Sequence, residues 1–208
     1  KMPDSQKRVL EALRDELTDG RAYTEGGGGA WALYKTLLRT GYAQPDLAHI
    51  KKRLRKRLLE EFESLLVVES DEPTPSLSLD DWQRQQLRLE AAKSLTSDTS
   101  FRTVVNHRMS LVDAALALLN GQYDTAADLA VDAADANPDM LFVHWYRLSA
   151  LMEAEEYKKA TAALEQFRAA LPEADNPHRA YLTAYEAILA HRRGDNQKAA
   201  SRYYEVLQ

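Results

Sequence analysis

Apolar residues recur at intervals of three and four along most of this chain of 208 residues. The segment 47–68 shows the pattern most clearly, with apolar side chains at Ile50, Leu54, Leu58, Phe62, Leu65 and Leu66. This spacing places side chains on one face of an α-helix. Comparable spacing predicts further helices over 4–18, 30–39, 79–95, 101–120, 123–136, 141–154, 156–170, 178–193 and 196–207. The hydrophobic pattern therefore predicts an all-α fold.

Glycine and proline separate these predicted helices. Four consecutive glycines, Gly26 to Gly29, disfavour a helix and predict a flexible loop between the first two helices. A phosphate-binding glycine loop would need a preceding strand and a Lys-Ser/Thr partner, and neither is present. The segment 69–78 is acidic and carries Pro73 and Pro75, which predicts an extended loop. The segment 96–100 is predicted to be non-helical and to separate the helix over 79–95 from the helix over 101–120.

One stretch of the sequence occurs twice. Tyr123, Ala126 and Pro138 recur 34 residues later as Tyr157, Ala160 and Pro172. Each residue type has a mechanical role in a stack of helical hairpins. The alanine lets two helices approach closely, the tyrosine fills the wedge to the next hairpin, and the proline ends the second helix. Because a single hairpin cannot bury its own apolar face, the repeat predicts stacked hairpins.

This repeat resembles the tetratricopeptide repeat, which has a 34-residue period. The first copy matches the motif at Gly121, Tyr123, Ala126, Ala133 and Pro138. The second copy matches at Tyr157, Ala160, Leu164, Phe167 and Pro172, with Glu155 in place of the turn glycine. A third copy matches at Gly194, Ala199 and Tyr203, has Asn196 where the tyrosine is expected, and is displaced by five extra residues around 173–177. The resemblance covers the chain from Met109 onward and implies a right-handed α-solenoid of antiparallel helical hairpins.

The first half of the chain matches the repeat in outline only. We interpret residues 1–95 as degenerate hairpins with a proline-rich loop at 69–78, followed by three repeats over 96–208. Under this interpretation the chain is one continuous solenoid of about five hairpins. The alternative is a separate N-terminal helical bundle fused to three repeats.

In the family that the repeat resembles, the first helix of each hairpin lines a concave groove. The resemblance carries the groove positions over to Arg108, Leu111, Ala115, Leu118, Phe142, Trp145, Ser149, Met152, Tyr181, Ala184, Ile188 and His191. A shift of one residue in the second copy would instead place Val143, Tyr146 and Ala150 in the groove. This apolar and aromatic lining suits an amphipathic helix or an extended hydrophobic peptide. Packing between helices is the alternative role for Trp145 and Tyr181.

Composition narrows the chemistry that the chain can perform. The absence of cysteine excludes disulfides, thiolate metal sites and a cysteine nucleophile. The five histidines form no i,i+4 pair of the kind that binds zinc on a helix, and no serine-nucleophile motif occurs. We therefore expect a scaffold or adaptor for a protein or peptide partner, with no catalytic residues, no cofactor and no metal. The net charge of −5 argues against nucleic acid as the partner.

One dense charge block runs from Lys51 to Arg57, and three glutamates follow it at positions 60, 61 and 63. One interpretation is a solvated helix face whose charges balance internally. The other is a docking patch for an acidic partner, formed by Lys51, Lys52, Arg55 and Lys56. Binding through such a patch would weaken steeply with added salt.

Two further expectations concern the location of the protein and its assembly. No apolar run approaches the length of about 20 residues that spans a bilayer, so we expect no membrane span and a cytoplasmic location, with a periplasmic domain as the alternative. The last predicted helix carries Tyr203, Tyr204 and Leu207 without a polar capping helix after it. This pattern raises a further hypothesis, that the chain is a structural or self-association module of a larger multidomain protein.

Overall fold

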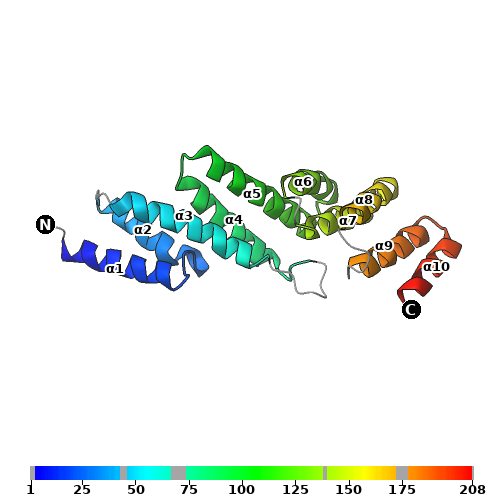
Figure 1. The fold of residues 1–208 in the computed structure, drawn as a ribbon, viewed down its shortest axis with the longest axis horizontal. Helices are drawn as coiled ribbons and strands as arrows, with labels where there is room; N and C mark the ends of the chain where they lie inside the picture. Colours follow the sequence, from blue (N-terminus) through cyan, green and yellow to red (C-terminus); the bar gives the residue numbers. More distant parts are fainter. Residues whose placement is uncertain (1–2, 43–45, 67–73, 138–139, 172–177, 208) are drawn as a thin grey trace. The chain divides into compact units, whose positions relative to one another are not determined.

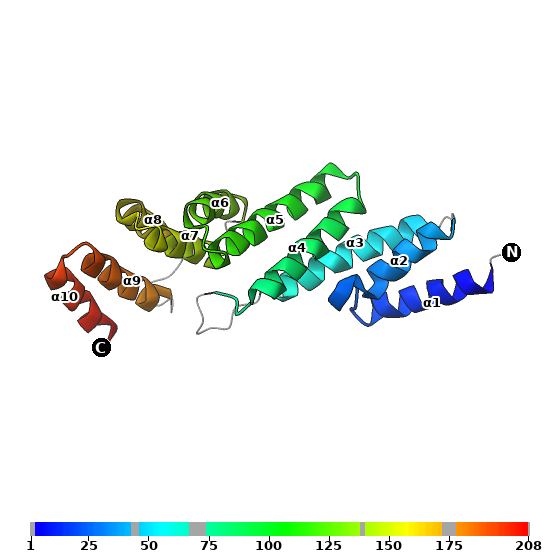
Figure 2. The same ribbon diagram turned by 180° about the vertical axis from the view of Figure 1, so that it is seen from behind.

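The computed structural model describes residues 3–42, 46–66, 74–137, 140–171 and 178–207. Its helices are α1 (Asp4–Thr18), α2 (Gly29–Arg39), α3 (Asp46–Ser64), α4 (Leu79–Ser94), α5 (Thr99–Leu119), α6 (Tyr123–Ala136), α7 (Phe142–Glu153), α8 (Tyr157–Ala170), α9 (His178–Arg192) and α10 (Asn196–Val206). No strand occurs within these ranges. Consecutive helices pair as hairpins: α1 packs against α2, α7 against α8 and α9 against α10, and α3 lies beside α4 in both views (Figures 1 and 2). The predicted all-α fold of helical hairpins is confirmed.

The chain divides into two compact units, which we describe separately. The first comprises residues 1–67 and 80–109, and the second comprises 68–79 and 110–208. Helix α5 therefore contributes its first half to one unit and its second half to the other. The domain organisation predicted from the sequence, one continuous solenoid or a bundle fused to repeats, stays a prediction.

In the first unit, the stripe of apolar residues on α3 forms much of the core. Ile50, Leu54, Leu58 and Phe62 are buried, as the spacing predicts, and Trp82 and Leu89 are buried on α4. Leu65 is instead 39% exposed, because α3 ends at Ser64 and the next residues form a turn that leaves the helical spacing. The proline-rich loop lies partly outside the described residues.

The connection between α1 and α2 is closed by backbone hydrogen bonds, where the sequence suggested a flexible loop. The N–H groups of Ala30 and Trp31 donate to the carbonyl oxygens of Arg21 and Ala22 at 2.9 and 3.0 Å. Gly29 has a φ of 71°, and a Cβ at this position would overlap the Arg21 carbonyl. Glycine is needed at this position both for the left-handed backbone and for the close approach of the chain.

A buried polar network ties this connection to α3 and α4. The Glu61 carboxylate accepts hydrogen bonds from the backbone N–H groups of Ala22, at 2.5 Å, and Tyr23, at 3.3 Å. Arg88 lies 3.6 Å from the same carboxylate and donates to the Tyr23 carbonyl, at 3.1 Å, and to Gln85, at 2.6 Å. Burial raises the pKa of the Glu61 carboxyl and lowers the pKa of Arg88, so each group depends on the other for its charge.

The start of α5 differs from the prediction. The sequence suggested that residues 96–100 interrupt the helices, whereas α5 already begins at Thr99. The Asp98 carboxylate accepts hydrogen bonds from the N–H groups of Ser100, at 3.1 Å, and Phe101, at 3.3 Å. An aspartate that caps the first free N–H groups of a helix explains the earlier start.

The second unit repeats one inner turn in each of its hairpins. In the second hairpin the Glu156 N–H donates to the Leu151 carbonyl at 2.9 Å, and matching bonds close the other two turns. The residue before the donor has a positive φ in every copy, 72° at Gly121, 59° at Glu155 and 81° at Gly194. This is the helix-terminating geometry that favours glycine. Glu155, the residue that departs from the repeat, therefore occupies a backbone position made for glycine.

Replacing Glu155 with glycine is expected to raise the free energy of unfolding by about 0.5–1 kcal/mol. A left-handed backbone costs an ordinary residue about 1–2 kcal/mol, and the extra unfolded-state entropy of glycine offsets part of the gain. Glu153→Gly, two residues earlier in the last turn of α7, should instead lower stability by about 0.5–1 kcal/mol. Urea denaturation of both variants checks the prediction, which fails if the two substitutions have the same sign.

The repeated alanines are buried in all three of these hairpins. Ala126, Ala160 and Ala199 are 1%, 0% and 3% exposed, on α6, α8 and α10 respectively. Their small side chains allow the close helix approach that the sequence predicts. The repeated prolines and the extra residues at 173–177 lie outside the described residues.

Candidate partner-binding site

An aromatic cluster centred on Trp145 of α7 joins three helices of the second unit. Its indole ring lies 4.7 Å from the ring of Phe167 on α8 and meets it edge to face. The rings of Tyr181 and Tyr185, both on α9, lie 6.1 and 5.0 Å from the same indole. Edge-to-face and tilted contacts at these distances are favourable for aromatic rings. Trp145 is 1% exposed, so it positions its neighbours from inside the core.

Seven of the predicted groove residues, counting both alignments of the second copy, are core residues. Leu111, Phe142, Trp145 and Tyr146 are 0%, 5%, 1% and 8% exposed, and the smaller Ala115, Val143 and Ala150 are buried as well. Burial raises the pKa of the Tyr146 hydroxyl, which keeps it neutral. Of the two roles considered for Trp145, its burial supports packing between helices. Helix α7 is short but has seven buried residues. More of its surface therefore faces the core than the family pattern implies, which explains why most of the predicted groove residues on this helix are buried.

The remaining predicted groove residues are partly exposed. Ser149, Tyr181 and Ile188 are half-buried, and the Ser149 hydroxyl lies 3.4 Å from the hydroxyl of Tyr185. Together Ser149, Tyr181, Tyr185 and Ile188 form what we call the α7–α9 surface. Tyr185 was not predicted from the sequence, although its i,i+4 spacing from Tyr181 places both on one face of α9.

Arg108 does not belong to this surface. Its guanidinium is 3.0 Å from the carboxylate of Glu63 on α3, within the first unit. The ion pair gives Arg108 a structural role between α3 and α5. Because the partner residue is distant in the sequence, the motif alone could not reveal this pairing.

His144 packs its ring on Phe167, with the ring centroids 5.0 Å apart and nearly parallel. Burial lowers its pKa, and the positive charge of Arg147 lowers it further, while Asp135 of α6 acts in the opposite direction. The environment of His144 in the folded state therefore favours the neutral imidazole. A depressed histidine pKa contributes stability above the unfolded value of about 6.5, and this contribution is lost as the pH falls through the folded value.

We therefore expect stability to fall when the pH is lowered from about 7.5 to about 5, since the unfolded chain gains a proton at His144 before the folded chain does. His144→Phe should reduce this loss because it removes the titration and keeps the stacked ring. Denaturation curves at both pH values test the effect, with His191→Gln as an exposed control. An unchanged pH dependence in His144→Phe would contradict the assignment.

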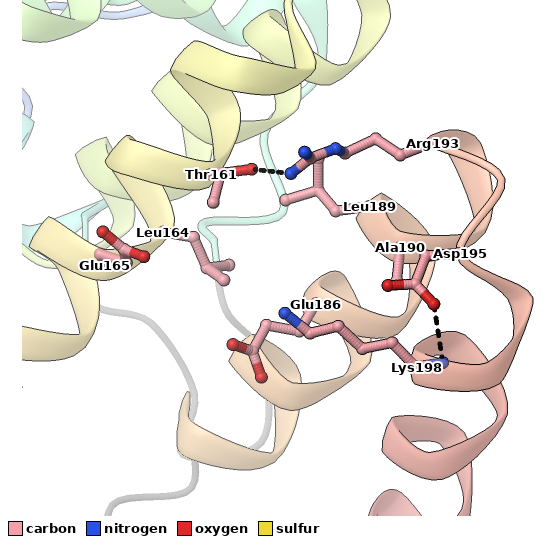
Figure 3. A pocket seen from close by; sticks show the side chains of 9 residues that line it. All are labelled: Thr161, Leu164, Glu165, Glu186, Leu189, Ala190, Arg193, Asp195 and Lys198. Atoms are coloured by element: carbon pink, nitrogen blue, oxygen red, sulfur yellow. Dashed lines mark hydrogen bonds between the residues drawn. The ribbon is translucent and has the colours of Figure 1, made fainter.

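A cavity of about 310 Å³ lies between α8, α9 and the start of α10 (Figure 3). Its lining is mixed in charge, and its polar groups link the helices to one another. Arg193 donates to the Thr161 hydroxyl, Asp195 accepts from the backbone N–H of Lys198, and Glu186 forms ion pairs with Arg168 and Arg202 at 3.1 Å. The Arg193–Thr161 and Arg168–Glu186 pairings join α8 to the last hairpin and give the cavity a structural role.

Two residues of the predicted basic patch, Arg55 and Lys56, form ion pairs with acidic side chains. Arg55 lies 3.3 Å from Asp98 and donates to the Thr96 hydroxyl, and Lys56 pairs with Glu60 at 3.4 Å. Lys51, Lys52 and Arg55 line a cavity of about 380 Å³ together with Asp98. Arg55 and Lys56 thus have acidic partners, Lys51 and Lys52 face this cavity, and the docking role of the patch stays a prediction.

The described part of the chain offers no candidate for two further kinds of site. No group of three or more histidine or acidic residues there could hold a metal ion. No helix in the same part of the chain is both long and apolar enough to cross a membrane.

This chain shows little similarity to known proteins. No family model matches the chain, and no curated protein matches it. One similar solved structure, described as "MamA RS-1 ArsTM double mutant", is 16% identical, with 100% of this chain and 95% of that chain covered and a TM-score of 0.49. At that identity and score the similarity does not establish a shared function.

Proposed function

We propose that this protein is a non-enzymatic adaptor that holds an apolar segment of a protein partner on the α7–α9 surface. The observation that carries the proposal is the pair Tyr181 and Tyr185, half-buried on one face of α9 and backed by the buried Trp145. Tyrosine offers a large contact area with few rotatable bonds, so little conformational entropy is lost on binding. Assignment of the hairpins to the tetratricopeptide repeat family forms part of the same proposal.

The composition of the surface favours an amphipathic helix or an extended hydrophobic peptide. Ile188 supplies an aliphatic contact, and the hydroxyls of Ser149 and Tyr185 supply polar ones. A small set of polar groups within an apolar surface is the usual arrangement for peptide recognition. Because Trp145 fixes the tyrosine rings from behind, the surface is preorganised, which lowers the cost of binding.

A peptide display selection on the wild-type protein tests this function. Selected peptides are then measured against Ile188→Lys and against a control, Leu38→Lys, on an exposed position of α2. We expect Ile188→Lys to weaken binding by about tenfold or more, and the control to bind like the wild type. Failure to select any saturable ligand, or equal affinity for both variants, would reject the proposal.

The two lysines beside the cavity in the first unit support a second candidate function, electrostatic docking of an acidic partner. Lys51 and Lys52 line that cavity together with Ser97. Binding of a poly-glutamate peptide should weaken with added salt and with the substitution of both lysines by glutamate. Binding that is unaffected by either change would remove this candidate.

A further inference from the structure

A basic cavity lies in the first unit, where α3 meets the turn between α4 and α5. It measures about 380 Å³, and its polar lining consists of Lys51, Lys52 and Arg55 from α3 and of Thr96, Ser97 and Asp98 from the turn. Ligand sites in proteins usually have volumes of about 300–1,000 Å³. The cavity is therefore large enough to receive a small ligand or one modified side chain of a partner.

The cations of this lining outnumber its acids. Lys51, Lys52 and Arg55 face a single carboxylate, that of Asp98, so the three cations and one anion leave a net charge of +2. Arg55 pairs with Asp98 at 3.3 Å, whereas Lys51 and Lys52 form no ion pair with any residue that the structure describes. A concave site lined by one sign of charge concentrates ions of the opposite sign. The cavity therefore favours an anion.

Arg55 is held in a fixed orientation at the wall of the cavity. Its guanidinium donates to the Thr96 hydroxyl, pairs with Asp98, and lies over the Phe101 ring, 4.8 Å from the ring centroid. These polar contacts use two of the five N–H donors of the guanidinium. Because the side chain is already ordered, it loses little conformational entropy when a ligand binds to the remaining donors.

The Thr96 hydroxyl gives independent evidence for an acceptor in the ligand. Its oxygen accepts hydrogen bonds from Arg55 and, at 3.0 Å, from the backbone N–H of Asp98. A hydroxyl has two acceptor lone pairs and one proton, so both lone pairs are used and the O–H is left to donate. No described residue accepts this proton, although Thr96 is only 8% exposed. Buried donors are usually paired, and an oxygen of a bound anion would complete this one.

We propose that this cavity binds the phosphate group of a phosphorylated serine or threonine in a partner protein. A phosphate monoester carries a charge of about −1.5 to −2 near pH 7 and three strong acceptor oxygens, which match the charge and the donors of the cavity. A carboxylate offers one charge and two oxygens, so it matches them less well. The inference rests on the second candidate function above, docking of an acidic partner, and specifies the acidic group.

A labelled peptide with one phosphoserine among glycine and alanine residues is the probe, and its binding to the full chain is measured by fluorescence anisotropy. Two further peptides carry glutamate or unmodified serine at the same position. We expect the phosphoserine peptide to bind about tenfold more tightly than the glutamate peptide, because charge-assisted hydrogen bonds to phosphate are stronger and more numerous. The unmodified peptide should show no saturable binding.

The double variant Lys51→Gln, Lys52→Gln should bind the phosphoserine peptide about tenfold more weakly or less, since it removes the two unpaired charges of the cavity. Arg53→Gln, Lys56→Gln is the matched control. It removes the same charge from the same helix, at positions that do not line this cavity, and should bind within about threefold of the wild type. Circular dichroism of both variants confirms that the helices remain folded.

Three results would overturn the inference. Equal affinity for the phosphoserine and glutamate peptides, or binding of poly-glutamate alone, would reject the phosphate assignment and leave docking of an acidic partner intact, whereas no binding of any of these peptides would reject both. An equal loss in the two double variants would assign binding to the overall charge of α3. Displacement of the peptide by inorganic phosphate at the same affinity would show that the cavity takes a free phosphate compound and no partner segment.

Discussion

Replacing Trp145 with alanine is expected to lower the free energy of unfolding by about 3–5 kcal/mol, the usual cost of deleting a buried indole. The side chain is 1% exposed and contacts aromatic rings from α8 and α9. Its removal opens a cavity where three helices meet and withdraws the support behind Tyr181 and Tyr185. The second unit should therefore lose stability as a whole.

Chemical denaturation monitored by circular dichroism measures this effect. Trp31→Ala is a suitable control, because Trp31 is half-buried on α2, where it stacks on Tyr34 and lies under Lys35. We expect the control to cost less than half as much. A loss below about 1 kcal/mol for Trp145→Ala would show that the cluster is not a core.

The expected loss of stability in Trp145→Ala also affects the interpretation of binding experiments. A variant at Trp145 that loses its partner could do so by unfolding the surface, without any lost contact. Substitutions at Ile188 or Tyr185 change a half-buried residue and leave the buried indole in place. They are the variants that separate binding from folding.

Replacing Glu61 with alanine is expected to destabilise the protein by about 3–5 kcal/mol, as is typical when one partner of a buried ion pair is removed. Arg88 is 7% exposed, and its charge would remain in the core without the carboxylate 3.6 Å away. The N–H groups of Ala22 and Tyr23 would lose their acceptor as well. The connection between α1 and α2 depends on these bonds.

The double variant Glu61→Leu, Arg88→Met provides the sharper test. If the single-variant loss comes from an uncompensated charge, the double variant should recover a large part of the stability. Glu60→Ala, in an exposed pair on the same helix, should change stability by less than about 1 kcal/mol. A double variant as unstable as the single ones would assign the effect to the lost backbone hydrogen bonds instead.

Much of the fold could be predicted from local pattern. The helices of the second unit follow the predicted ranges closely, because periodic apolar residues and turn residues act over a few positions. The positive φ at Glu155 agrees with its alignment on Gly121 and Gly194. The start of α5 was placed too late, since the cap supplied by Asp98 was not recognised.

The candidate site was harder to predict than the fold. Family positions pointed to Trp145 and Tyr181, but a helical pattern cannot distinguish a residue that faces a partner from one that faces the next hairpin. In the structure Trp145 is buried, whereas Tyr181 is partly exposed. It also adds Tyr185, which the family pattern leaves out.

The sequence by itself determined the all-α class, the hairpin pairing and the repeat, because helix periodicity and the residues at each turn are local properties. Tertiary structure decided which apolar residues are core and which remain exposed, since burial depends on neighbours that are distant in the chain. Glu61 and Arg88, whose partners lie on other elements, could be paired only in the folded chain.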